Sequence, residues 1–323
     1  MSAFQAVTGL VFGMVHILHS LSPQNDMSSI CAELVDWYER ERRDLPWREP
    51  DVTAWQILVS EFMLQQTPVA RVAPIWLDWV ARWPTPSATA AASAADVLRA
   101  WGKLGYPRRA KRLHECAIAI ATEHDDRVPD DVDVLLTLPG VGAYTARAVA
   151  CFAYGQSVPV VDTNVRRVVA RAVHGLAEAG NPSAVRDLAD VAALLPNDQT
   201  APVFSAALME LGATVCTARS PKCGVCPLSV CAWRAAGYPP ATTAPRPSQR
   251  YAGTDRQVRG RLLDVLRGSS SPVLREQLDV VWLTDTAQRD RALDSLLVDG
   301  LVEQTADGRF ALAGEGDNAG PAD

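Results

Sequence analysis

The sequence lacks an overall excess of positive charge. Its 31 Lys and Arg residues are outnumbered by 37 Asp and Glu residues, which gives a net charge of −6 at pH 7. A protein with this balance has no general attraction to polyanions, so any contact with nucleic acid must rely on local charge. One local excess exists, because six basic residues and no acidic residue occur between positions 99 and 112: Arg99, Lys103, Arg108, Arg109, Lys111 and Arg112.

The sequence also lacks a clear signal for secretion or membrane insertion. The apolar stretch from Ala3 to Leu21 has no Lys or Arg before it, and Gln5, His16 and His19 interrupt it. A signal peptide needs a basic start, and a membrane helix needs about 20 strongly apolar residues. We therefore expect a cytoplasmic protein without a membrane anchor, in which residues 1–27 are a non-native or disordered extension.

Strand patterns are almost absent, whereas helical patterns fill the chain. Apolar residues recur at helical spacing between Pro and Gly breaks, so residues 28–238 are expected to form an all-α domain. The expected helices are 30–43, 55–66, 69–83, 88–104, 108–123, 131–138, 143–154, 165–175, 183–195 and 203–213. Residues 239–254 are rich in Pro, Ser and Thr and predict a linker. Three further helical patterns and a hairpin predict a small winged-helix-like domain at 255–313, followed by a disordered tail at 314–323.

Cysteine is unevenly distributed along the chain. Three of the seven cysteines are isolated, and four lie within 16 residues in the spacing C-x6-C-x2-C-x4-C: Cys216, Cys223, Cys226 and Cys231. An odd total with one tight group favours a metal site in a reducing compartment over a disulfide framework. Four close thiolates suit an iron–sulfur cluster, whereas zinc usually uses two Cys-x-x-Cys pairs with a longer spacer. The interpretation is an iron–sulfur cluster, with zinc or free thiols as the alternatives.

A glycine turn followed by an acidic residue occupies the centre of the chain. Leu138-Pro139-Gly140-Val141-Gly142 separates two helical patterns. Its glycines leave backbone N–H groups accessible at a helix start, where the helix dipole favours a phosphate. Twenty residues after Gly142, Asp162 precedes a further helical run. Taken alone, the turn also fits an ordinary helix–helix connection, and Asp162 also fits a simple N-cap.

A second acid lies in the run Ser60-Glu61-Phe62-Met63-Leu64-Gln65-Gln66-Thr67, inside an apolar helical pattern. Glu61 alone also fits a solvent-facing helix position. The whole run closely resembles MutY-type A/G-specific adenine DNA glycosylases. The glycine turn and Asp162 resemble the helix-hairpin-helix and Gly-Pro-Asp segments of the endonuclease III-like superfamily to which that family belongs. The resemblance covers residues 30–237.

The resemblance implies a two-lobed all-α fold with an iron–sulfur loop. A six-helix barrel lobe would span residues 46–157, and an iron–sulfur lobe would combine 28–45 with 158–238. Members of the family hold a [4Fe–4S] cluster on the spacing C-x6-C-x2-C-x5-C, so the four clustered cysteines would bind it here, with a last gap one residue shorter. The Nudix-like C-terminal domain of many relatives is too large for the residues after the linker, so its contacts to 8-oxoguanine are not carried over.

The resemblance also implies a set of residues that bind substrate and DNA. Trp47 would belong to the adenine pocket, Gln66 would meet the base opposite the target, and Tyr106 would wedge into the base stack. The complete set is Trp47, Arg48, Leu64, Gln65, Gln66, Thr67, Leu104, Gly105, Tyr106, Gly140, Val141, Gly142 and Glu210, with Arg108, Arg109, Lys111 and Arg112 near phosphates. Two positions depart from the family pattern, because Thr163 replaces a glycine and Pro107 replaces a tyrosine.

Two carboxyl groups would perform the chemistry. Adenine is a poor leaving group, so Glu61, with its pKa raised by an apolar pocket, would protonate the base. Asp162, supported by Asn164 and the following helix start, would stay ionised and stabilise the sugar cation. Tyr144 stands where bifunctional relatives carry a lysine, which implies a glycosylase without strand-cleaving activity. The target base would have to be flipped out of the duplex.

The expected function is base excision repair of double-stranded DNA, by removal of adenine mispaired with 8-oxoguanine or guanine. We expect the enzyme to be a monomer and to be associated with the nucleoid. One alternative is a thymine or uracil mismatch glycosylase on the same fold, against which the Gln65-Gln66-Thr67 run argues. The other is a non-catalytic DNA-binding protein, against which the presence of both Glu61 and Asp162 argues.

Overall fold

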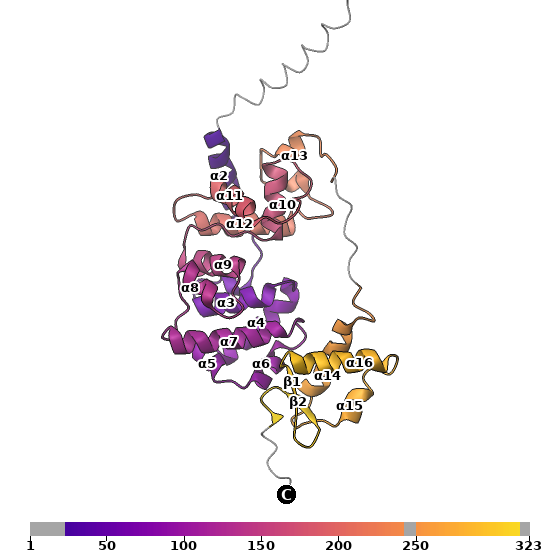
Figure 1. The fold of residues 1–323 in the computed structure, drawn as a ribbon. Helices are drawn as coiled ribbons and strands as arrows, with labels where there is room; N and C mark the ends of the chain where they lie inside the picture. Colours follow the sequence, from indigo (N-terminus) through magenta and orange to yellow (C-terminus); the bar gives the residue numbers. More distant parts are fainter. Residues whose placement is uncertain (1–22, 242–249, 317–323) are drawn as a thin grey trace, which may run out of the picture. The chain divides into compact units, whose positions relative to one another are not determined.

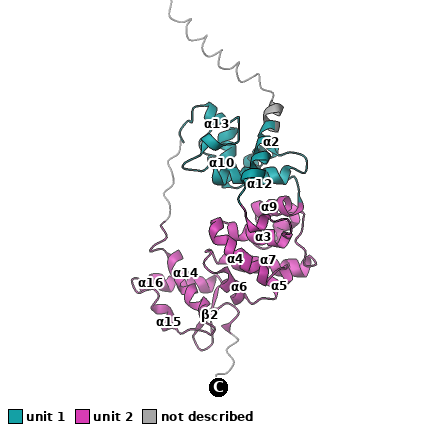
Figure 2. Cartoon of the chain, turned by 180° about the vertical axis from the view of Figure 1, so that it is seen from behind, with its two compact units in different colours: residues 1–43, 155–244 teal, residues 44–154, 245–323 magenta. Residues whose placement is uncertain are grey.

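The computed structural model describes residues 23–241 and 250–316. The chain divides into two compact units, each built from segments that are distant in the sequence (Figure 2). The first unit comprises Met1–Arg43 and Gly155–Ala244, and the second comprises Asp44–Tyr154 and Pro245–Asp323. Residues 1–22 of the expected extension, 242–249 of the expected linker and 317–323 of the expected tail lie outside the described residues.

Helices α2, α10 and α12 form the core of the first unit (Figure 1). The helices of this unit are α2 (Pro23–Glu41), α10 (Thr163–Ala172), α11 (Ala184–Leu194), α12 (Ala201–Thr214) and α13 (Ala232–Ala235), with a 3-10 turn at Cys223–Val225. Their apolar faces meet at Leu34, Trp37, Val168, Phe204 and Leu211, all of which are buried. This burial is the main favourable contribution to the packing of the three helices.

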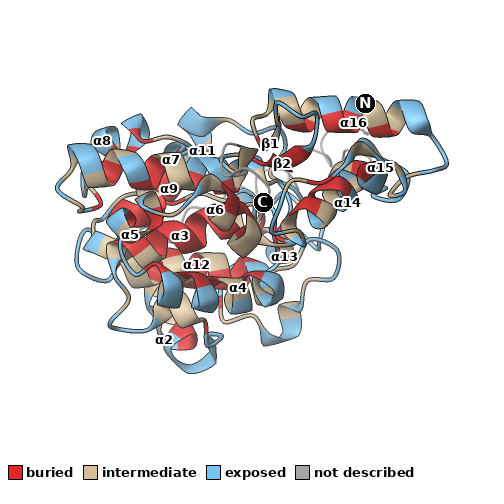
Figure 3. Ribbon diagram, turned by 90° about the horizontal axis from the view of Figure 1, so that it is seen from below, coloured by how far each residue is buried: buried red, intermediate tan, exposed pale blue. Residues whose placement is uncertain are grey.

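Helix α3 is the central helix of the second unit, and eight of its eleven residues are buried (Figure 3). The helices of this lobe are α3 (Ala54–Leu64), α4 (Val69–Arg82), α5 (Pro86–Ala90), α6 (Ala94–Trp101), α7 (Arg108–Glu123), α8 (Val132–Thr137) and α9 (Ala143–Tyr154). Thr53 and Gln56 form a capping box that starts α3. A helix that is apolar on all sides can only be stable when other helices surround it.

The turn between α8 and α9 requires glycine at one position. Gly140 has φ +78°, and a Cβ atom there would lie 2.7 Å from Arg112 Cβ and 2.9 Å from Phe62 Cε1. Both the backbone conformation and the close approach therefore exclude a side chain. At Gly142, by contrast, an added Cβ would meet nothing within 4 Å. The turn thus packs against α3 and α7 at Gly140, whereas Gly142, just before α9, faces open space.

The C-terminal region contains three helices and an antiparallel hairpin, as the sequence predicts. They are α14 (Asp255–Arg267), α15 (Arg275–Asp279), α16 (Thr286–Val298), β1 (Val302–Gln304) and β2 (Phe310–Leu312). Val302 pairs with Leu312 in the hairpin. Leu262, Leu293 and Leu312 are buried between the helices and the hairpin. The region packs through α14 and β2 on α6 of the same unit (Figure 1).

The predicted all-α fold with a small C-terminal hairpin is confirmed. The expected range of α7 is reproduced at both ends, whereas α3 ends at Leu64 and not at Gln66. Within residues 23–241 and 250–316, no helix is both long enough and apolar enough to cross a membrane.

Candidate functional site

Glu61 lies on α3 in the interior of the second unit. Only 7 % of its surface is exposed, and its neighbours Ser60 and Phe62 are also buried. The alternative that Glu61 is a solvent-facing helix residue is therefore wrong. Burying a carboxyl group costs free energy unless its surroundings compensate, so a buried acid in an apolar helix is a candidate for function.

The loop after α3 carries Gln65, Gln66 and Thr67. Gln66 adopts φ +56°, a conformation that residues other than glycine rarely adopt. Thr67 is buried, and its Oγ1 donates a hydrogen bond to the carbonyl oxygen of Leu104 at 3.3 Å. This bond joins the loop after α3 to the loop that precedes α7.

Tyr106 lies in that second loop, between α6 and α7. It has φ +48°, follows Gly105 at φ +86°, and is 44 % exposed. The indole Nε1 of Trp101 donates a hydrogen bond to the carbonyl oxygen of Gly105 at 3.0 Å. Gln66, expected to meet the base opposite the target, and Tyr106, expected to wedge into the base stack, are thus both held in the left-handed region. Conformations of this kind persist only where surrounding contacts maintain them, and they often mark functional positions.

One side chain, Arg109 of α7, maintains both loops. Its Nη1 donates hydrogen bonds to the carbonyl oxygens of Phe62 at 2.9 Å, Met63 at 3.1 Å and Gln65 at 2.5 Å. Its Nη2 donates to Thr67 Oγ1 at 2.9 Å and to the Gly105 carbonyl at 3.2 Å. These two nitrogens could therefore donate to a DNA phosphate only if some of their hydrogen bonds within the protein were broken.

The electrostatic state of Arg109 follows from its burial. The pKa of its guanidinium is lowered to about 10, chiefly by desolvation; the nearby charge of Arg71 contributes to this lowering, and Tyr106 opposes it. It remains protonated at neutral pH. Its carbon Cζ lies 5.4 Å from the ring centroid of Tyr106 and 5.2 Å from that of Trp101, so it also contacts the faces of both rings.

The four basic side chains expected near phosphates each have a partner within the protein, but those of Arg108 and Arg112 remain 71 % and 61 % exposed, so their contact with phosphates stays a prediction. Arg109 binds the two loops, Arg108 pairs with Asp299 of the C-terminal region, and Lys111 donates to the carbonyl oxygen of Asp299 at 3.2 Å. Arg112 pairs with Glu115 at 2.8 Å on the surface of α7. The sequence predicted the positive charge of this segment correctly, but much of that charge is used within the protein.

Trp47 and Arg48 lie on a 3-10 turn, Pro46–Arg48, beside α3. The rings of Trp47 and Trp76 meet edge to face, with centroids 5.9 Å apart. Trp76 in turn donates its Nε1 hydrogen to the carbonyl oxygen of Gln56 on α3, at 2.9 Å. Trp47 is half-buried and is therefore held in place while part of its surface remains accessible.

The helix-hairpin-helix turn presents its open side at Gly142, while Val141 is buried. Tyr144 lies in the first turn of α9 and is half-buried. The first N–H groups of a helix have no partner within the helix, so an open glycine at this point can receive an anion.

Asp162 is the N-cap of α10 in the first unit. Its Oδ1 accepts a hydrogen bond from Val165 N at 2.7 Å, and its Oδ2 accepts one from Asn164 Nδ2 at 2.8 Å. Burial raises the pKa of the Asp162 carboxyl above its usual value, although these bonds and the charge of Arg167 oppose the shift. Asp162 therefore is an N-cap, as the simpler interpretation holds. A catalytic role for the same carboxylate stays a prediction.

The two departures from the family pattern near Asp162 and Tyr106 fit without backbone strain of their own. Thr163 is exposed at the first position of α10 and has helical geometry, so the freedom of glycine is not needed there. Pro107 serves as the N-cap of α7 at φ −62°, which proline favours.

Asn164 is itself fixed from two sides. Arg167 Nη2 donates hydrogen bonds to Asn164 Oδ1 and to the Gly212 carbonyl, both at 2.7 Å. A Cβ atom at Gly212 would lie 2.7 Å from the Cβ of Asn164, so α12 approaches α10 closely only because Gly212 has no side chain. The Asp162 carboxylate is thus oriented through Asn164 and Arg167.

Glu210, which the resemblance places in the DNA-binding set, is buried inside the first unit, and its role toward DNA stays a prediction. Its side chain is 0 % exposed and forms a bidentate ion pair with Arg43, at 2.6 Å from Nε and 2.9 Å from Nη2. This pair fixes the end of α2 to α12 within the first unit. Removal of either partner would leave a buried charge unpaired, which is strongly destabilising, so the pair is important for the integrity of the lobe.

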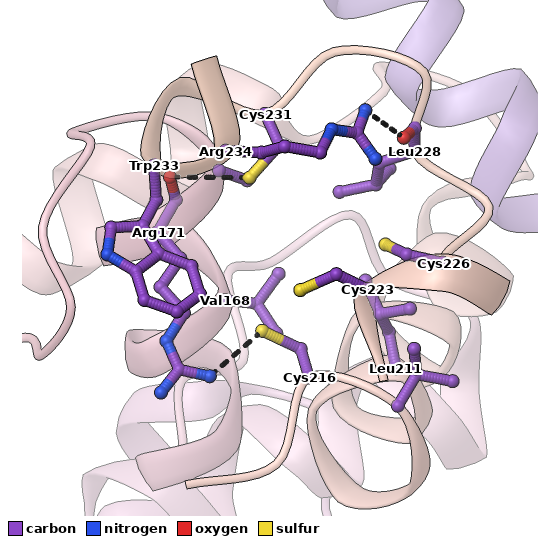
Figure 4. Close-up of a pocket in the computed structure, with 12 residues that line it drawn as sticks. Val168, Arg171, Leu211, Cys216, Cys223, Cys226, Leu228, Cys231, Trp233 and Arg234 are labelled. Carbon is purple, nitrogen blue, oxygen red and sulfur yellow. Dashed lines mark hydrogen bonds between the residues drawn. The ribbon is translucent and has the colours of Figure 1, made fainter. Parts of the chain in front are cut away.

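The four clustered cysteines line one pocket of the first unit (Figure 4). No group of three or more His, Cys, Asp or Glu side chains within the described residues converges closely enough to hold a single metal ion. Four thiols around one shared pocket match the four thiolate ligands that an iron–sulfur cluster needs. Cys231 lies on the same pocket, so the shorter last gap of the motif is accommodated.

Polar groups around this pocket suit an anionic sulfur cluster. Arg171 Nη1 lies 3.5 Å from Cys216 Sγ and donates to the Thr217 carbonyl at 2.8 Å. Arg234 also lines the pocket, and most of the other lining residues are apolar, among them Val168, Leu211 and Leu228 (Figure 4). Hydrogen bonds to sulfur and a dry surrounding are the features that a protein uses to hold and tune such clusters.

Comparison with known protein families identifies two segments. Residues 59–190 match the HhH-GPD superfamily base excision DNA repair protein. Residues 216–229, which include three of the four clustered cysteines, match the iron-sulfur binding domain of endonuclease III. The chain therefore carries a binding domain for a [4Fe–4S] cluster.

Comparison with curated proteins gives relatives over nearly the whole chain. An adenine DNA glycosylase of Mycolicibacterium smegmatis is 77% identical over 296 residues, which cover 92% of this chain and 100% of the relative. One of Mycobacterium tuberculosis is 72% identical over 303 residues, covering 94% and 100%. The human adenine DNA glycosylase is 40% identical over 215 residues, covering 64% of this chain and 39% of the relative.

Solved structures show the same fold. A thermostable thymine-DNA glycosylase aligns with a TM-score of 0.60 and 26% identity, covering 66% of this chain and 98% of that chain. An endonuclease III–DNA complex aligns with a TM-score of 0.57 and 21% identity, covering 67% and 99%. The motifs, the fold and the relatives agree, and the chain belongs to the adenine DNA glycosylase family of base excision repair enzymes.

Proposed function

We propose that this enzyme removes adenine mispaired with 8-oxoguanine or guanine from double-stranded DNA, acting as a monomer on the DNA of the nucleoid. The observation that carries the proposal is the buried acid Glu61, followed directly by a loop that Arg109 ties to the Tyr106 loop. This arrangement joins a proton donor to the residues expected at the mispair. The relatives named as adenine DNA glycosylases support the choice of base.

We assign the proton transfer to Glu61. Loss of adenine as an anion is slow, so protonation of the base on a ring nitrogen must accompany cleavage of the N-glycosidic bond. A carboxylic acid in a buried, largely apolar helix is suited to that donation. Trp47 and Arg48, beside α3 in the same unit, would then hold the flipped base.

We assign stabilisation of the sugar cation to Asp162. Its carboxylate is oriented by Asn164 and by the N–H of Val165, so it does not need to reorganise as positive charge develops on the sugar. The same division between a proton donor and a carboxylate occurs in glycoside hydrolysis. Water then adds to the anomeric carbon of the sugar cation and loses its proton to the Glu61 carboxylate, which leaves an abasic site and restores the acid.

The product is an intact strand with an abasic site, because the assigned site offers no amine. Tyr144 occupies the first turn of α9, where its phenol cannot form a Schiff base. Strand cleavage by β-elimination needs a primary amine that attacks the sugar. The enzyme is therefore proposed to be monofunctional.

The [4Fe–4S] cluster would be held by Cys216, Cys223, Cys226 and Cys231, where it supplies a structural cross-link and a local charge. Arg219 and Lys222 lie within this loop and are proposed to contact DNA phosphates. Arg171 would donate a hydrogen bond to the Cys216 sulfur and so support the loop.

Single-turnover cleavage of four duplexes tests the proposal. Adenine is placed opposite 8-oxoguanine, guanine, cytosine or thymine, and a thymine:guanine duplex serves as the control. We expect rapid release of adenine opposite 8-oxoguanine and guanine, no release of thymine, and strand breaks only after alkali. Release of thymine from the control duplex would favour the thymine glycosylase alternative, which the structural likeness to such an enzyme makes the second candidate.

A further inference from the structure

The C-terminal region is joined to the basic segment by ion pairs. Within the second unit, Arg99 pairs with Glu315 at 2.5 Å and also donates to the Ser269 carbonyl at 2.8 Å. Arg267 of α14 donates to the Leu98 carbonyl of α6 at 3.0 Å. Arginines from both sides, one carboxylate and two backbone carbonyl oxygens therefore make up this part of the joint.

Asp299, at the end of α16, is the centre of this joint. Its side chain is only 4 % exposed and binds Arg108 of α7 and Arg259 of α14, the latter at 2.6 Å. These two guanidinium groups hold the pKa of Asp299 below its usual value. Lys111 approaches the end of the same helix, where the helix dipole favours a cation. A buried carboxylate stabilises the contact between the C-terminal region and α7 only while its arginine partners are present, because an unpaired buried charge is unfavourable.

The joint brings the start of α14 to the Tyr106 loop. Arg256, the second residue of α14, donates a hydrogen bond from Nη1 to the Tyr106 hydroxyl at 3.3 Å. A cation in the first turn of a helix is unfavourable for the helix itself. An acidic residue at this position would therefore stabilise α14 more than Arg256 does. The side chain of Arg256 instead forms its hydrogen bond with Tyr106.

We propose that Arg256 is a positioning residue for Tyr106. Arg109 lies against the ring and Arg256 holds the hydroxyl, so the side chain is fixed from both ends before DNA arrives. A wedge that is already ordered loses less conformational entropy when it enters the base stack. The inference rests on the proposed function, because it uses the insertion of Tyr106 beside the mispair.

A double-mutant cycle tests the contact. Arg256→Ala, Tyr106→Phe and the double variant are compared in single-turnover cleavage of adenine opposite 8-oxoguanine. They are also compared in the fluorescence of 2-aminopurine placed beside the base opposite a non-cleavable adenine analogue. Loss of one such hydrogen bond should lower the rate and the 2-aminopurine signal roughly three- to tenfold. In the Tyr106→Phe background, Arg256→Ala should cause no further loss.

Arg261→Ala is the matched control. Arg261 lies on the same helix, carries the same charge, and stacks on Trp282 of its own region, with Cζ 5.1 Å from the ring centroid. It should leave both readouts unchanged. The inference is overturned if Arg256→Ala behaves like this control, or if its loss multiplies with that of Tyr106→Phe, which would mean that Arg256 acts without the hydroxyl. Because the 2-aminopurine signal needs no cleavage, failure of adenine release alone would contradict only the proposed function.

Discussion

Replacement of Arg109 by alanine should disturb together the two loops that we propose to face DNA, those of Gln66 and Tyr106. The substitution removes five hydrogen bonds from one charged donor, of which three reach carbonyl oxygens at the end of α3. A bond from a charged donor contributes about 1.5–3 kcal/mol, but water can reach part of this site and replace some of the bonds. We therefore expect a loss of about 2–4 kcal/mol in the free energy of unfolding, near the upper range for single substitutions. In thermal denaturation this corresponds to a decrease of roughly 4–16 °C.

The functional effect of Arg109→Ala should exceed its effect on folding. Gln66 and Tyr106 hold left-handed backbone conformations that relax when the guanidinium is lost, so single-turnover release of adenine should fall by at least about tenfold at a temperature where the variant is folded. Arg40→Ala is the control, because Arg40 is outside the expected DNA-binding set and forms an exposed ion pair with Asp36 on α2. Equal melting temperatures and equal rates for the two variants would refute the assignment of Arg109 as the support of both loops.

Three further predictions concern the acids and the cysteines. Glu61→Gln keeps the shape of the side chain but cannot donate the proton, so excision should fall by roughly 10²–10⁴-fold while DNA binding, measured by anisotropy, persists; unchanged excision would exclude Glu61 as the acid. Cys223→Ser should abolish the content of about four iron and four sulfide per chain, and stoichiometric zinc in the unmodified protein would contradict the cluster. Asn164→Ala removes a hydrogen bond that favours the Asp162 anion, so the acidic limb of the pH–rate profile should move to higher pH. Burial raises the pKa of the Asp162 carboxyl in the folded protein above its value in the unfolded chain. The free energy of unfolding therefore falls as the pH rises through the folded-state pKa, and this fall should be larger in the variant. An acidic limb that does not move would contradict a role of ionised Asp162 in the rate.

Local sequence patterns were sufficient for most helices but not for the ends that matter at the site. The apolar spacing and the Pro107 break predict α7 over Arg108–Glu123, as the structure has it. The same reasoning extends α3 to Gln66, whereas the helix ends at Leu64. Its last carbonyl oxygens bind Arg109, which lies more than 40 residues further along the chain. Periodicity contains no information about such a distant partner.

The role of each charged residue was harder to predict than its presence. Glu61 could not be placed from the pattern, because a helix that is apolar on all sides gives no polar face for comparison. Glu210 was assigned to DNA by resemblance, although its partner Arg43 is 167 residues away. One local signal could have indicated the role of Arg109. Side chains near a helix start lean toward the preceding loop, so an arginine two residues into α7 points back at Tyr106.

The acidity of the C-terminal region, with 13 acidic and 10 basic residues from position 241 onward, argues against a simple grip on DNA phosphates. The structure gives that acidity another use, because Asp299 and Glu315 each bind an arginine of the basic segment. An acidic region that neutralises part of this segment lowers non-specific attraction to undamaged duplex, since each free cation adds to salt-dependent binding. Two cations, Arg109 and Arg256, contact Tyr106, the residue expected to test the base pair. Discrimination between mispairs should thus depend on the order of the loops more than on the total charge of the surface.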